Sequence, residues 1–135
     1  MKYFNAGQIC TTIDHIYIPE DKVKEFTEMS KGIVTERYPH LSSPDFTSMI
    51  DDRSFNRVVG AMEEAQERGA TLVQLIPGRQ WDAATRKIAP HIVLNAPADC
   101  ALRTREIPEF FGGVLGTIQA TSDAAFRRLV ARFTA

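Results

Sequence analysis

The sequence predicts an α/β fold, namely a single three-layer-like domain with a largely parallel sheet. Two observations predict this fold. Apolar or alternating segments typical of strands recur along the chain, and segments with helical periodicity lie between them. The chain has 135 residues, which is enough for one hydrophobic core but too few for a cofactor domain and a separate catalytic domain. We therefore expect residues 1–135 to form one domain.

The N-terminal part predicts one strand followed by one helix. Residues 11–18 (TTIDHIYI) alternate between β-branched or aromatic and polar side chains, and Pro19 then breaks the run. This pattern predicts a strand that starts directly after Cys10. Residues 20–38 predict a helix, which Pro39 ends. Its apolar residues at helical spacing are Val23, Phe26, Met29 and Ile33.

A second helix is expected after an irregular crossing loop. Residues 40–48 (HLSSPDFTS) are rich in turn formers and predict this loop. Asp51, Asp52 or Ser54 can cap the next helix, and Gly69 ends it. Its apolar stripe consists of Phe55, Val58, Val59, Met62 and Ala65.

Strand patterns dominate the second half of the chain. Residues 70–76 (ATLVQLI) predict a buried strand that the Pro77-Gly78 turn closes, and residues 91–95 (HIVLN) predict another. Residues 79–87 (RQWDAATRK) have no clear period, and we predict no element there. Residues 113–120 (GVLGTIQA) predict a fourth strand.

The C-terminal segment predicts a last helix. Thr121 or Ser122 can cap it, and one face carries Phe126, Leu129, Val130 and Phe133. Because strands and helices alternate through much of the chain, we expect most strands of the sheet to be parallel.

The composition indicates no nucleic-acid partner and no membrane span, and the compartment expected by default is the cytoplasm. Sixteen basic and 17 acidic side chains give a net charge of −1, so no nucleic-acid partner is indicated. No apolar run approaches the roughly 18 residues that cross a membrane, and no signal-peptide pattern opens the chain. His15, His40 and His91 are dispersed, without ligand-like spacing, so no metal site is predicted.

The N-terminal stretch YFNAGQIC points to thiol chemistry at Cys10. A cysteine becomes a nucleophile where backbone amides, a helix start or a cation stabilise its thiolate. Gly7 permits close approach of the backbone, and the amides of Asn5 and Gln8 can fix the loop. A second interpretation is that Cys10 is a small buried hydrophobe. The same interpretation is favoured for Cys100, in the apolar context ADCAL.

A longer stretch carries a family resemblance. Residues 4–26 (FNAGQICTTIDHIYIPEDKVKEF) resemble the region around the catalytic cysteine of the aldehyde dehydrogenase superfamily, with its N-x-G-Q-x-C core. Within it, the chain is most similar to the coniferyl aldehyde dehydrogenase branch, where an aspartate also follows the cysteine by four places, as Asp14 does here. The resemblance continues through residues 48–72 and 86–102, and it covers roughly residues 2–120.

The resemblance implies a fold, a reaction and a nucleophile. It implies the fold of the aldehyde dehydrogenase catalytic domain and NAD- or NADP-dependent oxidation of a small aldehyde through a thioester on Cys10. The backbone amide of Cys10 would form half of an oxyanion hole. Asn5, Gly7 and Gln8 fall on the same motif as supports of the loop.

The family's second signature, E-I-F-G-P, implies the cofactor-binding residues. Its glutamate falls on Glu106 when counted from upstream and on Glu109 when counted from downstream. Phe111 matches the phenylalanine that lies against the nicotinamide. The sequence departs from the pattern by three extra residues and by Gly113 in place of proline.

The resemblance also implies what this chain lacks. In the family, the dinucleotide-binding domain, the general base and half of the oxyanion hole precede the cysteine. We therefore expect a truncated catalytic domain that binds no cofactor and is not competent alone. The alternative is a non-catalytic interaction or scaffold domain, with at most weak thiol esterase activity. A face uncovered by truncation would be buried in a homodimer or larger homo-oligomer.

Overall fold

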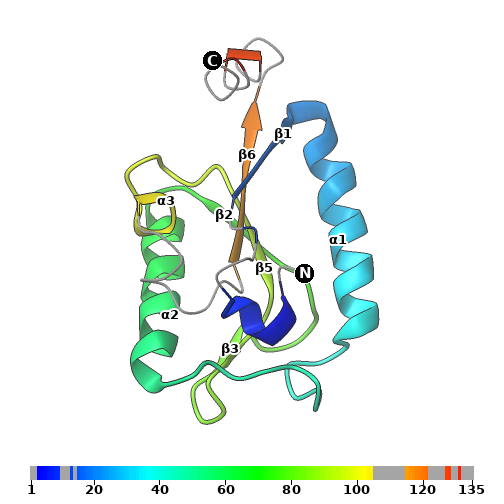
Figure 1. Cartoon of the computed structure of the whole chain (residues 1–135), viewed down its shortest axis with the longest axis vertical. Coiled ribbons are helices and arrows are strands. Elements are labelled where there is room, and N and C mark those ends of the chain that lie inside the picture. Colours follow the sequence, from blue (N-terminus) through cyan, green and yellow to red (C-terminus); the bar gives the residue numbers. More distant parts are fainter. Residues whose placement is uncertain are drawn as a thin grey trace.

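The computed structural model describes residues 3–9, 13, 15–104, 115–121, 127, 128 and 131. Figure 1 shows the arrangement of the elements. The helices are η1 (Phe4–Gly7), η2 (Glu20–Lys22), α1 (Val23–Arg37), α2 (Asp52–Glu67) and α3 (Ala101–Thr104). The strands are β1 (His15–Pro19), β2 (Thr71–Gln74), β3 (Trp81–Asp82), β4 (Lys87–Ile88), β5 (His91–Leu94) and β6 (Leu115–Thr121).

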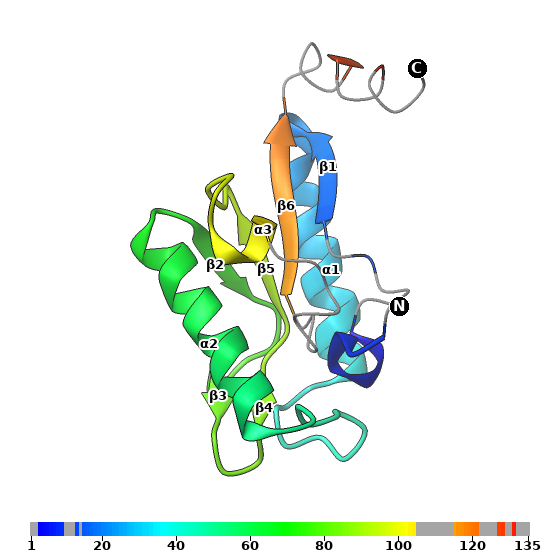
Figure 2. The ribbon, with the colours of Figure 1, turned by 60° about the vertical axis from the view of Figure 1, so that its left-hand side comes forward.

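The described strands form a largely parallel sheet, as predicted. Its order is β1-β6-β5-β2. β6 is parallel to both neighbours, with His15 opposite Thr117 and His91 opposite Leu115, and β2 alone is antiparallel, to β5. Figure 2 shows β1 and β6 side by side. The sheet therefore joins the N-terminal and C-terminal parts of the chain through adjacent strands.

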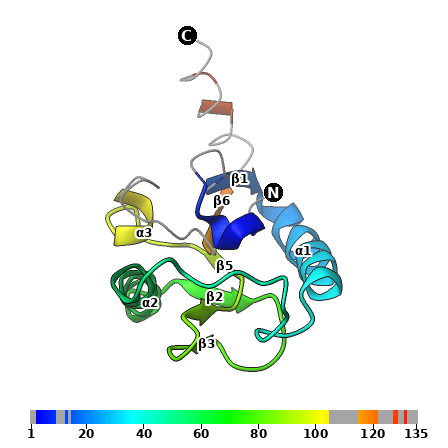
Figure 3. The same cartoon turned by 60° about the horizontal axis from the view of Figure 1, so that its bottom comes forward.

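The helices cover both faces of this sheet. α1 lies on one side, and α2 and α3 lie on the other (Figures 1 and 3). This is the three-layer arrangement that the sequence predicts. The fold class is therefore confirmed.

The structure differs from the predicted elements at the start of β1 and at residues 81–88. β1 starts at His15, whereas the pattern predicted a strand from Thr11; Ile13 lies outside the strand, because β6 pairs with β1 only from Thr117 onward. β3 and β4 form an antiparallel pair at residues 81–88, where we predicted no element. The apolar residues of the predicted last helix lie outside the described residues.

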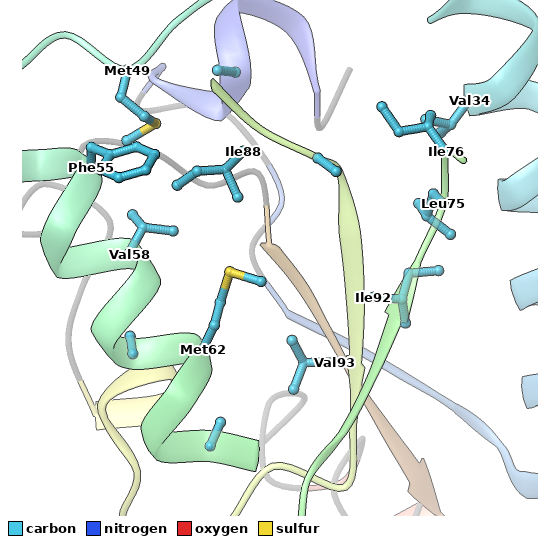
Figure 4. Packing of buried hydrophobic residues seen from close by; sticks show 14 of the residues in the cluster. Val34, Met49, Phe55, Val58, Met62, Leu75, Ile76, Ile88, Ile92 and Val93 are labelled. Atoms are coloured by element: carbon cyan, nitrogen blue, oxygen red, sulfur yellow. The ribbon is translucent and has the colours of Figure 1, made fainter. Parts of the chain in front are cut away.

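α2 confirms the predicted helix and identifies its cap. The Asp51 carboxylate accepts a hydrogen bond of 2.6 Å from the backbone N–H of Ser54, which satisfies a donor that the helix itself cannot pair. The chain turns away at Gly69, whose φ of +94° suits glycine. The predicted stripe is buried except for Val59, which is half-buried, and Figure 4 shows Met62 directed toward Val93 across the core.

α1 confirms the predicted helix but only half of its predicted apolar face: Val23 and Phe26 are half-buried and pack against the core. Met29 and Ile33 are 60% and 63% exposed, whereas Thr27 and Val34 are buried. Because each residue turns an α-helix by about 100°, Ile33 and Met29 lie about 100° and about 140° around the axis from Val34. The spacing of the apolar residues was correct for a helix, but the face that packs on the sheet is rotated toward Thr27 and Val34.

His91 is a buried titratable group in the core. Its Nδ1–H donates to the carbonyl oxygen of Ala89 at 2.6 Å, and its Nε2 lies 3.4 Å from the side-chain amide of Gln80. Both contacts suit the neutral ring with its proton on Nδ1. Burial lowers the pKa of His91 below its ordinary value, and the Ala89 bond opposes this shift. His91 therefore has a structural role.

Replacing methionine by alanine will distinguish a buried methionine of α2 from an exposed methionine of α1. We expect Met62→Ala, at a site with 0% exposure, to lower the free energy of unfolding by about 2–5 kcal/mol because it leaves a cavity. Met29→Ala is the matched control and, measured at a concentration at which the protein is monomeric, will change that free energy by less than about 0.5 kcal/mol. Urea unfolding measures both; equal losses would contradict the observed orientation of α1.

His91 will make the fold sensitive to acid. An unfolded histidine binds a proton below its ordinary pKa of about 6.5, and buried His91 resists that proton. Its contribution to stability is therefore complete above that pH and decreases as the pH falls through the lowered pKa. Comparing unfolding free energies at pH 7.5 and pH 5.5 will show a smaller decrease in His91→Asn than in the wild type. The exposed His40→Asn control will behave like the wild type.

Candidate functional site

The predicted site residues fall into two groups. Cys10, Glu106, Glu109 and Phe111 lie outside the described residues, so their roles stay predictions. The predicted loop supports, Asn5, Gly7 and Gln8, are described.

The turn at residues 5–7 has left-handed backbone geometry. φ is +51° at Asn5, +53° at Ala6 and +71° at Gly7. Glycine adopts this region freely and asparagine often does, but for a residue such as Ala6 it costs about 1–2 kcal/mol. Such conformations persist where the surroundings impose them, and they cluster at functional sites. The turn is closed by a 3.0 Å hydrogen bond from the Gln8 N–H to the Asn5 carbonyl.

Tyr3 attaches this turn to the sheet. Its hydroxyl donates to the carbonyl oxygen of His91, the first residue of β5, at 3.2 Å. Burial raises the pKa of the Tyr3 phenol, so the hydroxyl keeps its proton and remains a donor. Tyr3 belongs to the stretch YFNAGQIC, for which the sequence predicted thiol chemistry, but the sequence assigned Tyr3 no role.

Gln8 holds a segment that is distant in sequence. Its Nε2 donates to the carbonyl oxygens of Asn5 and Ser48, each at 3.1 Å, and its Oε1 accepts the N–H of Ile50 at 2.8 Å. Donor and acceptor of one amide group therefore both bind the backbone. Gln8 was predicted to support the loop, but its hydrogen bonds to residues 48 and 50 have no signal in the sequence.

The turn lies at the edge where the parallel strands begin. The contact between Tyr3 and His91 places it at the start of β5, and the dark-blue η1 lies near the start of β6 in Figure 1. Because β1 and β6 are adjacent and parallel, the chain enters both strands from the same edge. Cys10 precedes the first residue of β1 by five positions, and Phe111 precedes that of β6 by four.

A hollow of about 380 Å³ borders the turn. Its walls combine two aromatic rings, polar side chains, one guanidinium and one carboxylate: Phe4, Asn5, Arg37, Tyr38, Asp45 and Thr47. Arg37 is the last residue of α1, where a cation is favourable toward the helix dipole. A hollow of this size and mixed character can accept a small organic molecule.

Other candidate residues have structural surroundings. Cys100 is fully buried, as predicted, and its backbone begins α3. Within the part of the chain that the structure describes, no three His, Cys, Asp or Glu side chains gather to hold a metal ion. None of the described helices is long and apolar enough to cross a membrane.

Known proteins match the sequence over most of its length. The sequence model of the aldehyde dehydrogenase family matches residues 1–130. Coniferyl aldehyde dehydrogenase from Pseudomonas sp. strain HR199 is 34% identical over 118 residues, which are 85% of this chain and 24% of that enzyme. The chain thus spans about a quarter of the length of this relative.

Solved structures share the fold. The substrate-bound state of Staphylococcus aureus AldH matches with a TM-score of 0.80 and 22% identity, covering 98% of this chain and 27% of that one. Mycobacterium tuberculosis aldehyde dehydrogenase complexed with NAD⁺ matches with a TM-score of 0.71 and 22% identity, covering 95% and 26%. The match of the family over residues 1–130 confirms the resemblance seen in the motifs, and the chain belongs to the aldehyde dehydrogenase family.

Proposed function

We propose that this chain carries the nucleophile of an aldehyde-oxidising site, and that Cys10 is that nucleophile. The observation that carries the proposal is the parallel pairing of β1 with β6. This pairing brings the entries of two strands to one edge, and the two family motifs precede those strands in the sequence. The turn at residues 5–7, which belongs to the first motif, is attached to the same edge through Tyr3.

The reaction follows from thiol chemistry. The Cys10 thiolate adds to the aldehyde carbonyl carbon, and loss of hydride from the adduct leaves a thioester. Water then hydrolyses the thioester, releasing the carboxylic acid and restoring the thiol. The hydride acceptor in the family is NAD or NADP, for which Glu106 or Glu109, together with Phe111, are the proposed contacts.

The proposed substrate is a small aldehyde. The similarity to an enzyme named coniferyl aldehyde dehydrogenase favours an aromatic aldehyde for this chain as well. The hollow beside Asn5 supports this choice, because the exposed ring of Phe4 offers a surface on which an aromatic substrate can stack. A reducing compartment such as the cytoplasm would keep Cys10 as a thiol.

Replacing Cys10 tests the proposal. We expect the wild type to hydrolyse an activated ester, p-nitrophenyl acetate, and Cys10→Ser to lose at least about a hundredfold in rate, because the hydroxyl is a much weaker nucleophile. Cys100→Ala is the matched control and will keep the rate, with circular dichroism confirming that each variant is folded. Equal rates in wild type and Cys10→Ser would exclude Cys10 as the nucleophile.

A second function is favoured by one observation, the altered cofactor signature. Three extra residues and Gly113 interrupt the segment that would contact the nicotinamide. This supports a non-catalytic interaction domain with residual thiol esterase activity. Calorimetric titration with NAD and NADP discriminates between the two functions: binding supports the oxidoreductase, and no binding by a protein with a reactive Cys10 supports the second function.

We also propose that the chain self-associates. Met29 and Ile33, one helical turn apart, expose large apolar side chains on α1. Sedimentation velocity will show a dimer or larger species. A double variant, Met29→Glu with Ile33→Lys, will shift the population toward the monomer because the charges resist burial. A wild type that remains monomeric at high concentration would contradict this.

A further inference from the structure

Residues 48–50, here called the Met49 segment, lie outside the described helices and strands. Their backbone groups are bound from two sides instead. On one side, Gln8 binds the Ser48 carbonyl and the Ile50 N–H. On the other side, the Met49 N–H donates to the Arg86 carbonyl at 2.8 Å, and the Arg86 Nε donates to the Met49 carbonyl at 3.2 Å.

This alternation is the pattern of a strand between two neighbours. In extended backbone, the polar groups of residues i and i+2 point to one side and those of residue i+1 to the other. Here the side-chain amide of Gln8 takes the place of one neighbouring strand. The carbonyl and guanidinium of Arg86 take the place of the other. The Met49 side chain is 1% exposed and lies beside Phe55 and Ile88 (Figure 4). The segment is therefore fixed in the core between Gln8 and Arg86.

Arg86 is itself held in an unusual conformation. It ends the four-residue loop between β3 and β4 with φ of +52°, a region that favours glycine. An arginine there is strained, unlike a glycine. Its guanidinium makes two contacts that glycine would lose: the bond to the Met49 carbonyl, and an ion pair of 3.6 Å with Asp52, the first residue of α2.

We propose that Arg86 is a positioning residue for the thiol of Cys10, acting through the Met49 segment and Gln8. This rests on the proposed function, in which Cys10 is the nucleophile. Gln8 is two residues from Cys10 in sequence, and its amide is anchored on the backbone that Arg86 fixes from the far side. Nucleophilic reactions are sensitive to small displacements, so loosening that anchor changes thiol reactivity without removing any group that touches the substrate.

The variant Arg86→Gly tests the contribution of the guanidinium contacts alone. Glycine adopts a φ of +52° without strain, so the loop and the backbone bond from Met49 are retained while the guanidinium contacts are lost. The matched control is Arg79→Gly, which removes an exposed guanidinium just before β3. All variants carry Cys100→Ala, so that alkylation by iodoacetamide reports on Cys10 alone. Urea unfolding confirms that each is folded.

We expect Arg86→Gly to slow alkylation of Cys10 at pH 7 by about three- to tenfold. In the pH profile of alkylation, the midpoint will shift in Arg86→Gly in the same direction as in Gln8→Ala, because both variants loosen the same segment. Gln8→Ala will give a similar loss, and the double variant will lose no more than either single variant, because both act on one segment. Arg79→Gly will match the reference protein.

Three results would overturn the proposal: a folded Arg86→Gly protein that reacts as fast as the reference or faster, losses that multiply in the double variant, or an equal loss in Arg79→Gly. Alkylation needs only the thiol, so it separates this inference from the proposed function. Absence of Cys10-dependent ester hydrolysis, with the alkylation pattern as expected, would refute the proposed function and leave the positioning role of Arg86 intact.

Discussion

The parallel ladder between β1 and β6 is the constraint on which the rest of the fold depends. It joins residues about one hundred positions apart, His15 to Thr117. β6 also pairs with β5, so it connects the N-terminal strand to the β2–β5 pair. Contacts of such high sequence separation carry a large closure entropy, which the buried core must offset. In return, the chain enters β1 and β6 at one edge of the sheet.

Parallel pairing also determines where loops can gather. β1, β6 and β5 run parallel, and the connection from β1 to the antiparallel β2 carries α1 and α2, which cover opposite faces of the sheet (Figure 3). Antiparallel β2 reverses this direction, so the connection from β2 to β5, including β3 and β4, reaches the edge at which β5 begins. Residues 3–9, the Met49 segment and Arg86 consequently meet there, linked by side-chain hydrogen bonds.

The sequence predicted the elements whose determinants are local. α2 has an acidic cap, an apolar stripe and a terminal glycine within one segment, and each was recognisable. The buried face of α1 depends on which residues the sheet contacts, so Met29 was misplaced. Strands of two residues, such as β3 and β4, are too short to show a period. The contacts of Gln8 and Arg86 with residues 48–50 are non-local, and no pattern in the chain indicates them.

The hydrogen bonds of Gln8 by themselves explain why this position needs an amide side chain. Its Oε1 must accept the Ile50 N–H while its Nε2 donates to the Ser48 carbonyl. A carboxylate has no donor for the carbonyl and would repel it, and a hydroxyl is too short to reach both groups. The amide thus serves as a strand partner that the sheet does not provide. Gln8, two positions before the proposed nucleophile, is in this way coupled to the core through Met49. The position of the proposed nucleophile therefore depends on how Met49 packs.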